Sequence, residues 1–304
     1  MYQGVINVYK EAGYTSHDVV ARLRGILKQK KIGHTGTLDP AAKGVLPVCL
    51  GQATRLCDML ADKPKTYETV MLLGTITDTQ DTTGTVLKTC PVTVSEEEVR
   101  AAAESFMGDY SQIPPMYSAL KVNGKKLYEL AREGKEVDRK ARPVTILELV
   151  ITRIELPRVW MRVSCSKGTY IRTLCSDIGE KLGCGGTMES LVRTRVERFF
   201  LEEAMTLDEI ERARDEDTLA DRIVSIEDMF SRYEKAQTIK EADSLVRNGN
   251  PLKLSELSWQ EGGQTTEKAI IRVCDSSGRF MGIYRFEQER QFYKPWKMFL
   301  NAEM

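Results

Sequence analysis

Alternation of apolar and polar residues predicts strands in three parts of the first two hundred residues. Between residues 67 and 73 the pattern repeats every second position, so the predicted strand buries one face. The residues on that face are Tyr67, Thr69, Met71 and Leu73. Residues 159–165 alternate in the same way, as a half-buried strand does, and residues 1–9 form a further short strand.

Helical spacing follows hydroxyl residues that can cap a helix. Thr15 or Ser16 can begin a helix whose apolar positions recur every three or four residues. A capping box that starts at Ser95 opens a helix predicted through Phe106. Thr206 and Glu209 form a similar box in the acidic, helical stretch 201–222, which we expect to be an outer face of the protein. Residues 75–84 contain turn-forming Thr, Asp and Gly, and we expect a loop there.

The pattern changes near residue 231. A short helix is predicted at residues 239–247, followed by strands at 269–273 and 280–286 about the turn 275–278. We therefore expect two domains, 1–231 and 232–304.

Composition restricts the possible classes of protein. The 304 residues contain 44 basic and 44 acidic side chains, so any nucleic-acid surface must come from local segregation of charge. The seven cysteines include no Cys-x-x-Cys pair, which favours reduced thiols over a zinc site. Neither a signal segment nor an apolar run of membrane-spanning length is present, so we expect a cytoplasmic monomer without a membrane partner.

One stretch, KIGHTGTLDPAAKGVLPV at residues 31–48, concentrates unusual chemistry. Gly33 and Gly36 permit a tight path close to a ligand, and Pro40 biases Asp39 towards an extended backbone. Asp39 is the only carboxylate of the stretch and precedes an apolar run, as a catalytic acid can. From composition alone, ordinary turn chemistry is the favoured interpretation.

Longer motifs reverse that preference. GHTGTLDPAAKGVLPV resembles the signature of the tRNA pseudouridine synthase B family, whose aspartate in G-x-L-D-P is catalytic. Similar blocks follow in order and cover most of residues 3–200: KTYETVMLLGTITDTQDTTG, SQIPPMYSALKVNGKKLYELAREG and SKGTYIRTLCSDIGEKLG. The resemblance implies an α+β fold. Its catalytic domain has a central mixed, mostly antiparallel sheet flanked by helices, and a small β-barrel-like PUA domain for RNA binding follows.

The resemblance also assigns site residues. Asp39, Tyr67 and Arg172 are implied as catalytic, with Arg172 pairing with Asp39 and keeping it charged by lowering its pKa. Tyr67 stacks on the target base and can carry a proton. If residues 170–172 are extended, Tyr170 and Arg172 face one pocket. The implied substrate-binding residues are His34, Tyr170, Leu191, Lys121 and Arg132.

Three positions depart from the family pattern. Glu11 stands where proline is typical, Val192 replaces an arginine and Glu197 replaces a glycine. The last two put in doubt one RNA contact and one turn, whereas the catalytic centre is unaffected.

The implied activity is isomerisation of uridine 55 in the T loop of tRNA to pseudouridine, by base flipping, glycosidic cleavage and C5 reattachment. The reaction needs no cofactor or metal, and the partner is the tRNA T stem-loop. Whether Asp39 attacks the base, attacks the sugar or removes a proton stays open. A non-catalytic RNA-binding protein is the alternative, and Asp39 with Arg172 discriminates against it. A glycosidase would need two paired acids, and we find no second one.

Overall fold

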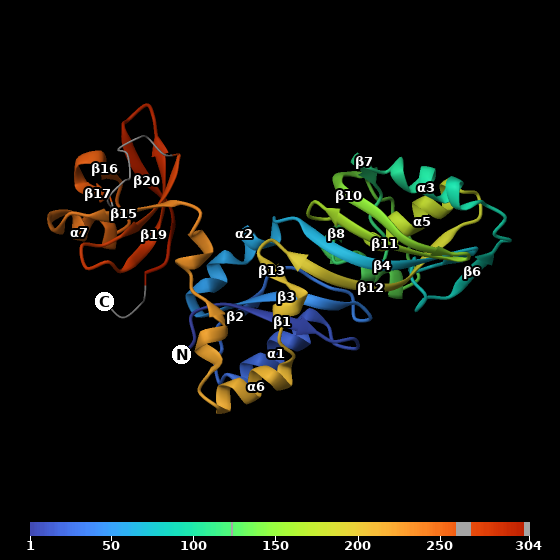
Figure 1. The fold of residues 1–304 in the computed structure, drawn as a ribbon, viewed down its shortest axis with the longest axis horizontal. Helices are drawn as coiled ribbons and strands as arrows, with labels where there is room; N and C mark the ends of the chain where they lie inside the picture. The colour runs from blue at the N-terminus through green and yellow to red at the C-terminus, as the bar shows by residue number, and fades with distance from the viewer. Residues whose placement is uncertain (123, 260–268, 301–304) are drawn as a thin grey trace.

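Two β-sheets, separate in sequence and in space, organise the chain (Figure 1). The computed structural model describes residues 1–122, 124–259 and 269–300. The first sheet has ten strands. Its main path runs through β14 (Ile223–Val224), β1 (Gly4–Lys10), β3 (Lys43–Leu50), β12 (Gly186–Val196), β4 (Lys65–Leu73), β11 (Arg158–Cys165), β10 (Arg142–Glu155) and β7 (Gly108–Gln112). Two further strands, β2 (Ile32–His34) and β13 (Phe199–Phe200), pair with β3 and β12.

The alternation that predicts β4 is confirmed. Tyr67, Thr69, Met71 and Leu73 are all buried, and the residues between them are more exposed. Because β4 lies between β11 and β12, its buried face contributes directly to the main core.

Among the strands that the structure describes, the only parallel pairing of two strands in the ten-stranded sheet joins β12 to β3. It consists of two register pairs, Val192 with Lys43 and Arg193 with Gly44. Gly44 has φ +105°, and a Cβ there would lie 2.2 Å from the carbonyl oxygen of Arg193, so only glycine fits. This short junction connects the β1–β3 half of the sheet to the half built on β4, β10 and β11.

Each half of the sheet is covered by its own helices (Figure 1). Apolar faces of α1 (Ser16–Ile26) and α6 (Leu207–Asp215) pack on the first half, and those of α3 (Glu96–Glu104) and α5 (Ile171–Lys181) pack on the second. The predicted capping boxes are present at the starts of α3 and α6, and α1 has one too, on Thr15. Helix α3 ends two residues before the predicted end at Phe106.

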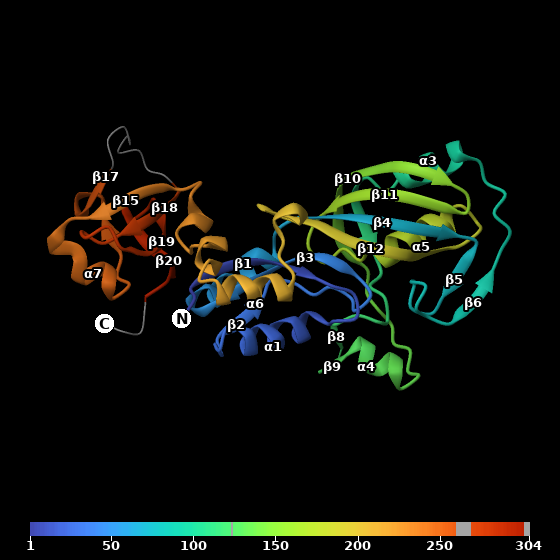
Figure 2. The same ribbon diagram turned by 60° about the horizontal axis from the view of Figure 1, so that its bottom comes forward.

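Two small hairpins extend from the second half of the sheet (Figure 2). One pairs β5 (Thr75–Thr77) with β6 (Val86–Thr89), so the expected loop at 75–84 in fact begins as a strand. The other pairs β8 (Lys121–Val122) with β9 (Lys125–Lys126) and leads into α4 (Leu127–Arg132).

The second sheet has six strands and curls into a small barrel-like unit. Its order is β16 (Leu252–Lys253), β20 (Phe292–Met298), β19 (Phe280–Glu287), β18 (Ile270–Cys274), β15 (Glu234–Thr238) and β17 (Leu257–Trp259), with α7 (Asp243–Arg247) beside it. The two strands predicted about the turn 275–278 are confirmed as β18 and β19. Phe280 stacks on Phe230 of the first unit, and the Phe299 ring packs against Phe230 at a tilt, so the two sheets are joined by an apolar contact. In the described ranges, no helix is both long enough and apolar enough to cross a bilayer.

Candidate active site

Asp39 lies on the loop between β2 and β3, where the backbone is held from several sides. The amide of Ala42 donates to the Asp39 carbonyl oxygen over 3.0 Å, and the amide of Gly13 donates to that of Pro40 over 2.9 Å. The buried ammonium group of Lys10 donates to the carbonyl oxygens of Pro40 (3.1 Å) and Ala42 (2.6 Å). These contacts fix the loop on both sides of the Asp39 carboxylate.

The Asp39 carboxylate meets the guanidinium of Arg172, 133 residues away in sequence. Arg172 Nε lies 2.9 Å from Asp39 Oδ2, and Nη2 lies 3.3 Å from Oδ1. The two contacts are side by side, the geometry in which a guanidinium binds a carboxylate most specifically. The Arg172 side chain is only 4% exposed, whereas that of Asp39 keeps 38% of its surface. The acid is therefore held from the protein side and accessible from the other.

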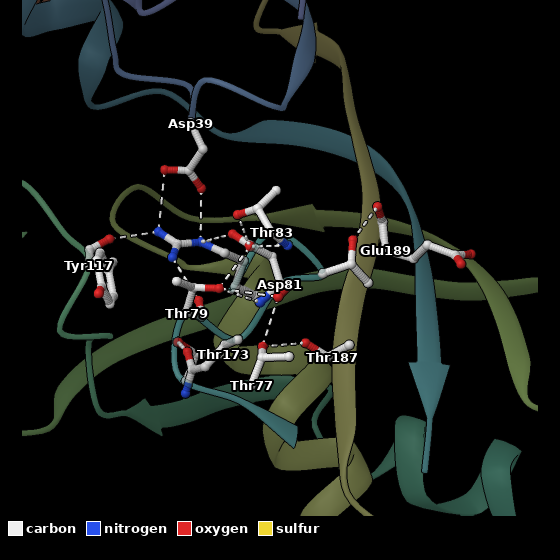
Figure 3. Close-up of polar contacts among 12 residues, drawn as sticks. Asp39, Thr77, Thr79, Asp81, Thr83, Tyr117, Thr173, Thr187 and Glu189 are labelled. Atoms are coloured by element: carbon white, nitrogen blue, oxygen red, sulfur yellow. Dashed lines mark hydrogen bonds and ion pairs between the residues drawn. The ribbon is translucent and has the colours of Figure 1, made fainter. Parts of the chain in front are cut away.

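Backbone carbonyl groups satisfy the rest of the Arg172 guanidinium (Figure 3). Nη1 donates to the carbonyl oxygen of Thr79 over 2.9 Å, and Nη2 donates to that of Tyr117 over 2.8 Å. Two loops distant in sequence thus meet at this arginine, and both fix its orientation towards Asp39.

A second carboxylate, Asp81, lies 3.8 Å from Arg172 Nε. The statement that the matching blocks hold no second acid is therefore wrong. Asp81 differs from Asp39, however, because Thr79 and Thr83 donate to its Oδ1 and its side chain is only 13% exposed. As the composition of residues 75–84 predicts, these are side chain–backbone turns. An acid that is mostly buried and bonded within its own turn does not serve the paired-acid chemistry of a glycosidase.

The net effect on the pKa of Asp39 is opposite to the expected one. Burial raises the pKa of Asp39 above its usual value, and the nearby Asp81 carboxylate raises it further. Arg172 lowers the pKa, but not by enough to outweigh burial. The guanidinium therefore limits the rise instead of producing a strongly acidic carboxyl group.

Tyr170 and Arg172 reach the site in a different way from the extended arrangement considered above. Tyr170 is extended and precedes α5, while Arg172 is already helical, so their side chains do not alternate as on a strand. Gln112 receives a hydrogen bond from the Tyr170 amide over 2.8 Å and donates to its carbonyl oxygen over 3.0 Å. Burial raises the pKa of the half-buried Tyr170, and Asp39 and Arg172 are close enough to influence it.

Tyr67 and Leu191 come from adjacent strands on the buried side of the sheet. Tyr67 is 9% exposed on β4, and Leu191 is 8% exposed on β12. Burial raises the pKa of the Tyr67 hydroxyl, and the neighbouring Arg193 guanidinium opposes that rise. Tyr67 and Leu191 pack in the same core cluster as Leu38, the residue that precedes Asp39.

His34, at the end of β2, is close to the second histidine of the chain. Its ring meets that of His17 edge-on, with centroids 5.0 Å apart, and its Nδ1 lies 3.1 Å from the carbonyl oxygen of Gly36. Burial lowers the pKa of His34, and His17 lowers it further, so the neutral ring is favoured.

Lys121 and Arg132 lie outside this cluster. Both are exposed, on β8 and at the end of α4, and the Arg132 guanidinium lies 5.4 Å from the centre of the Tyr128 ring. The same segment nevertheless reaches the site through Tyr117, whose carbonyl oxygen binds Arg172. The structure brings Asp39 and Arg172 into contact and packs Tyr67 and Leu191 in one core cluster, whereas His34 contacts His17 and Gly36, and Lys121 and Arg132 lie on the surface.

Two charged residues of the site, Lys10 and Arg193, are not singled out from the sequence, and a third, Asp81, is assigned only to a turn. Asp81 lies inside one of the quoted motifs, and all three residues lie in the region 3–200 that the resemblance mostly covers, which is the only signal that could have found them. Lys10 and Arg193 are 0% and 1% exposed, so both charges lie inside the protein. Charged residues are rarely buried, and alternation patterns do not reveal which of them are.

The departure at Glu197 does not abolish the turn that it put in doubt. Glu197 adopts φ +50°, the left-handed conformation that glycine occupies most easily. Lys63 and Arg232 lie 3.5 and 3.8 Å from its carboxylate. Val192, where the family pattern has arginine, pairs with Lys43 in the β12–β3 junction.

The mixed sheet with its covering helices has the pseudouridine synthase fold. Solved structures of known proteins share the fold. A chain of a Cbf5–Nop10–Gar1 complex matches with a TM-score of 0.73 and 27% identity, over 99% of this chain and 86% of that one. A chain of an H/ACA RNP bound to a substrate RNA containing 2′-deoxyuridine matches with a TM-score of 0.72 and 26% identity, with the same coverage.

Sequence comparison identifies the family within that class. The model of the TruB family pseudouridylate synthase (N terminal domain) matches residues 24–171, and that of the tRNA pseudouridylate synthase B C-terminal domain matches residues 172–231. The tRNA pseudouridine synthase B of Lachnoclostridium phytofermentans is 52% identical over 98% of this chain and 99% of its own length. That of Alkaliphilus oremlandii is 49% identical over 94% of this chain and 99% of its own. The chain belongs to the TruB family of pseudouridylate synthases.

Proposed function

We propose that this chain isomerises uridine 55 in the T loop of tRNA to pseudouridine. The observation that carries the proposal is the accessible Asp39 carboxylate held by the buried Arg172 guanidinium. Curated relatives of nearly full length, named tRNA pseudouridine synthase B, support tRNA as the substrate. Asp39 and Arg172 come from the same chain, so a monomer contains the complete pair.

The reaction detaches uracil from its ribose at N1, turns it and rejoins it through C5. Cleavage at the sugar carbon develops positive charge that a carboxylate stabilises. Asp39 is the acid available for this role, because Asp81 is nearly buried and its Oδ1 accepts hydrogen bonds from Thr79 and Thr83. Atoms balance without oxidation or hydrolysis, so the chemistry requires no cofactor.

The target base must leave the stacked T loop before it can reach Asp39. Flipping costs a few kcal/mol, and each stack of a base on an aromatic ring returns about 1–3 kcal/mol. We assign the stack under the base to Tyr67 and the walls of the pocket to Tyr170 and Leu191. The neutral His34 ring fills the space that the base vacates in the RNA.

Contacts with the RNA backbone position the T stem-loop. Lys121 and Arg132 suit this role, since both are exposed and no ion pair among the described residues includes them. We propose that residues 232–304 form a PUA-like RNA-binding domain that follows the catalytic domain of residues 1–231.

The test measures pseudouridine in unmodified tRNA transcripts incubated with the pure protein and no added metal. Asp39→Asn is expected to lower the single-turnover rate by at least about a thousandfold, with the tRNA dissociation constant changed by less than about tenfold. The matched control is Asp62→Asn, because Asp62 is an exposed acid paired with Lys167. Substantial turnover by Asp39→Asn would remove the aspartate from its role, and a wild-type protein that only binds tRNA would establish the non-catalytic alternative.

A further inference from the structure

Arg193, near the end of β12, is a buried cation without a carboxylate partner. It is the largest fully buried side chain of the described residues and is 1% exposed. In the described ranges, no ion pair within 4.0 Å includes it. Burying a charge without a counter-ion is costly, so a buried arginine of this kind requires an explanation.

The strand register places Arg193 directly opposite Tyr67. The two are Cα partners in the β12–β4 pairing, and both are buried, so their side chains project from the same face. Arg193 Nε donates to the Val45 carbonyl oxygen over 2.7 Å, which fixes the guanidinium plane between β3 and β4. The guanidinium also opposes the rise that burial causes in the pKa of the Tyr67 hydroxyl.

Two other buried cations nearby show what a purely structural role looks like. Lys10 donates to three carbonyl oxygens, and Lys65 donates to those of Ala61 and Lys63, so both act as ties between loop segments. Arg193 Nη2, in contrast, has no hydrogen-bond partner among the described residues. Buried polar groups are normally satisfied, so structure alone does not account for this guanidinium.

We propose that Arg193 is the positioning residue of Tyr67, holding its hydroxyl in the orientation that the extruded uridine requires. The Val45 carbonyl oxygen anchors the guanidinium through Nε, and Tyr67 lies opposite Arg193 on the adjacent strand β4. The inference rests on the proposed function and deepens it, because it assigns a role within the same site to a residue that lies opposite Tyr67 in the sheet and, among the described residues, forms no ion pair with Asp39.

A double-mutant cycle tests whether Arg193 acts through the Tyr67 hydroxyl. Single-turnover rates are measured with a saturating excess of enzyme over tRNA transcript for Arg193→Met, Tyr67→Phe and the double variant. Each single change is expected to lower the rate at least about thirtyfold, with the tRNA dissociation constant altered less than threefold. The double variant is expected to be no more than about threefold slower than Tyr67→Phe, since the group on which Arg193 acts is already absent.

Losses that multiply in the double variant would overturn the proposal, and so would a Tyr67→Phe enzyme of full activity. Arg195→Met is the matched control, because Arg195 is exposed two residues further along β12 and lies over Phe200; its rate should equal that of the wild type. If Arg193→Met does not fold, the cycle is run with Arg193→Lys, which can still bind Val45 but lacks the planar fork. A wild-type protein that forms no pseudouridine would refute the proposed function before the cycle begins.

Discussion

The two sheets of this protein treat charge in opposite ways. All four of the lysines and arginines that are buried in the described ranges belong to the ten-stranded unit: Lys10, Lys65, Arg172 and Arg193. The six-stranded unit buries Asp275, whose Oδ1 accepts hydrogen bonds from the amides of Ser277 and Arg279. The ten-stranded unit thus buries cations in its interior, whereas the buried charge of the six-stranded unit is an acid that completes an ordinary turn.

This difference distinguishes residues that the reaction requires from residues that the fold requires. A buried guanidinium costs several kcal/mol in lost hydration unless its partners compensate. In the ten-stranded unit this cost arises at the site where the segments with the longest motifs meet. The six-stranded unit instead contributes aromatic side chains to the contact with Phe230. We expect substitutions in the first unit to change the reaction rate and substitutions at the contact to change binding.

Removing the Arg172 guanidinium should produce the largest effect. In Arg172→Met the carbonyl groups of Thr79 and Tyr117 lose their donor, and Asp39 and Asp81 lose the cation that they share. We expect the single-turnover rate at pH 7.5 to fall about a thousandfold or more, because a buried pair is broken on one side only. Arg158→Met is the control, since that arginine forms an exposed pair with Glu189 and its loss should change the rate less than twofold. More than a tenth of wild-type activity in Arg172→Met would contradict the assignment.

Weakening the contact between the two units should affect RNA binding instead. Phe299 is 5% exposed, and its ring centre lies 5.7 Å from that of Phe230. Phe299→Ala removes a buried aromatic side chain and should weaken the packing at this contact by about 3–5 kcal/mol. We expect the tRNA dissociation constant to rise about tenfold while the rate at saturation stays within threefold. Filter binding and single-turnover assays measure the two quantities, with the exposed Phe200→Ala as control. A rate that falls as steeply as affinity would show that the contact also supports the catalytic site.

Much of the ten-stranded unit and part of its candidate site can be predicted from the sequence. Alternation identified β4 and its buried face, and the capping boxes at Ser95 and Thr206 located two helices. The long motifs indicated that Asp39 and Arg172 would meet, although 133 residues separate them. Local periodicity and a dense motif each suffice for such predictions, since neither depends on the detailed packing.

What could not be predicted depends on burial and on three-dimensional neighbours. Arg172 lies on a helix and not on an extended segment, because the extended backbone ends at Tyr170, two residues earlier than that arrangement requires. The net rise in the pKa of Asp39 follows from desolvation, a property of the folded surroundings. Asp81 was assigned to a turn, correctly, but its approach to Arg172 arises only when the 75–84 segment folds against α5.

Replacing Asp81 should change the pH dependence by a moderate amount. Burial raises the pKa of Asp39, and the Asp81 carboxylate adds to the rise. If ionised Asp39 is required, the rate falls as pH drops through this raised pKa. Asp81→Asn removes one cause of the rise, so the acid limb of the rate profile should move to lower pH, by less than about one unit. Single-turnover rates from pH 4.5 to 8 measure the shift.

Asp78→Asn serves as the control for this profile. Asp78 belongs to the same segment, but its Oδ1 accepts a hydrogen bond from the Thr85 amide, and Asp78 is not among the main influences on the pKa of Asp39. Its acid limb should coincide with that of the wild type. A limb that moves to higher pH in Asp81→Asn would mean that loss of order around Arg172 outweighs the removal of the like charge.

The smallest expected effect is on stability, at the turn occupied by Glu197. A left-handed conformation costs a residue with a side chain about 1–2 kcal/mol, and Glu197→Gly removes this cost. Glycine also makes the unfolded chain more flexible, which offsets about 0.4–1 kcal/mol of this gain in stability. The substitution also removes the ion pairs with Lys63 and Arg232, which are partly exposed and worth about 0–1 kcal/mol each. In 1 M salt these pairs are screened, so the free energy of unfolding should rise by about 0.5–1 kcal/mol, and in low salt the gain should shrink or vanish. Urea denaturation at both salt concentrations measures the difference.

A variant less stable than the wild type in 1 M salt would show that Glu197 makes a favourable contact beyond its ion pairs. It would also show that strain at this turn is smaller than its backbone angle indicates.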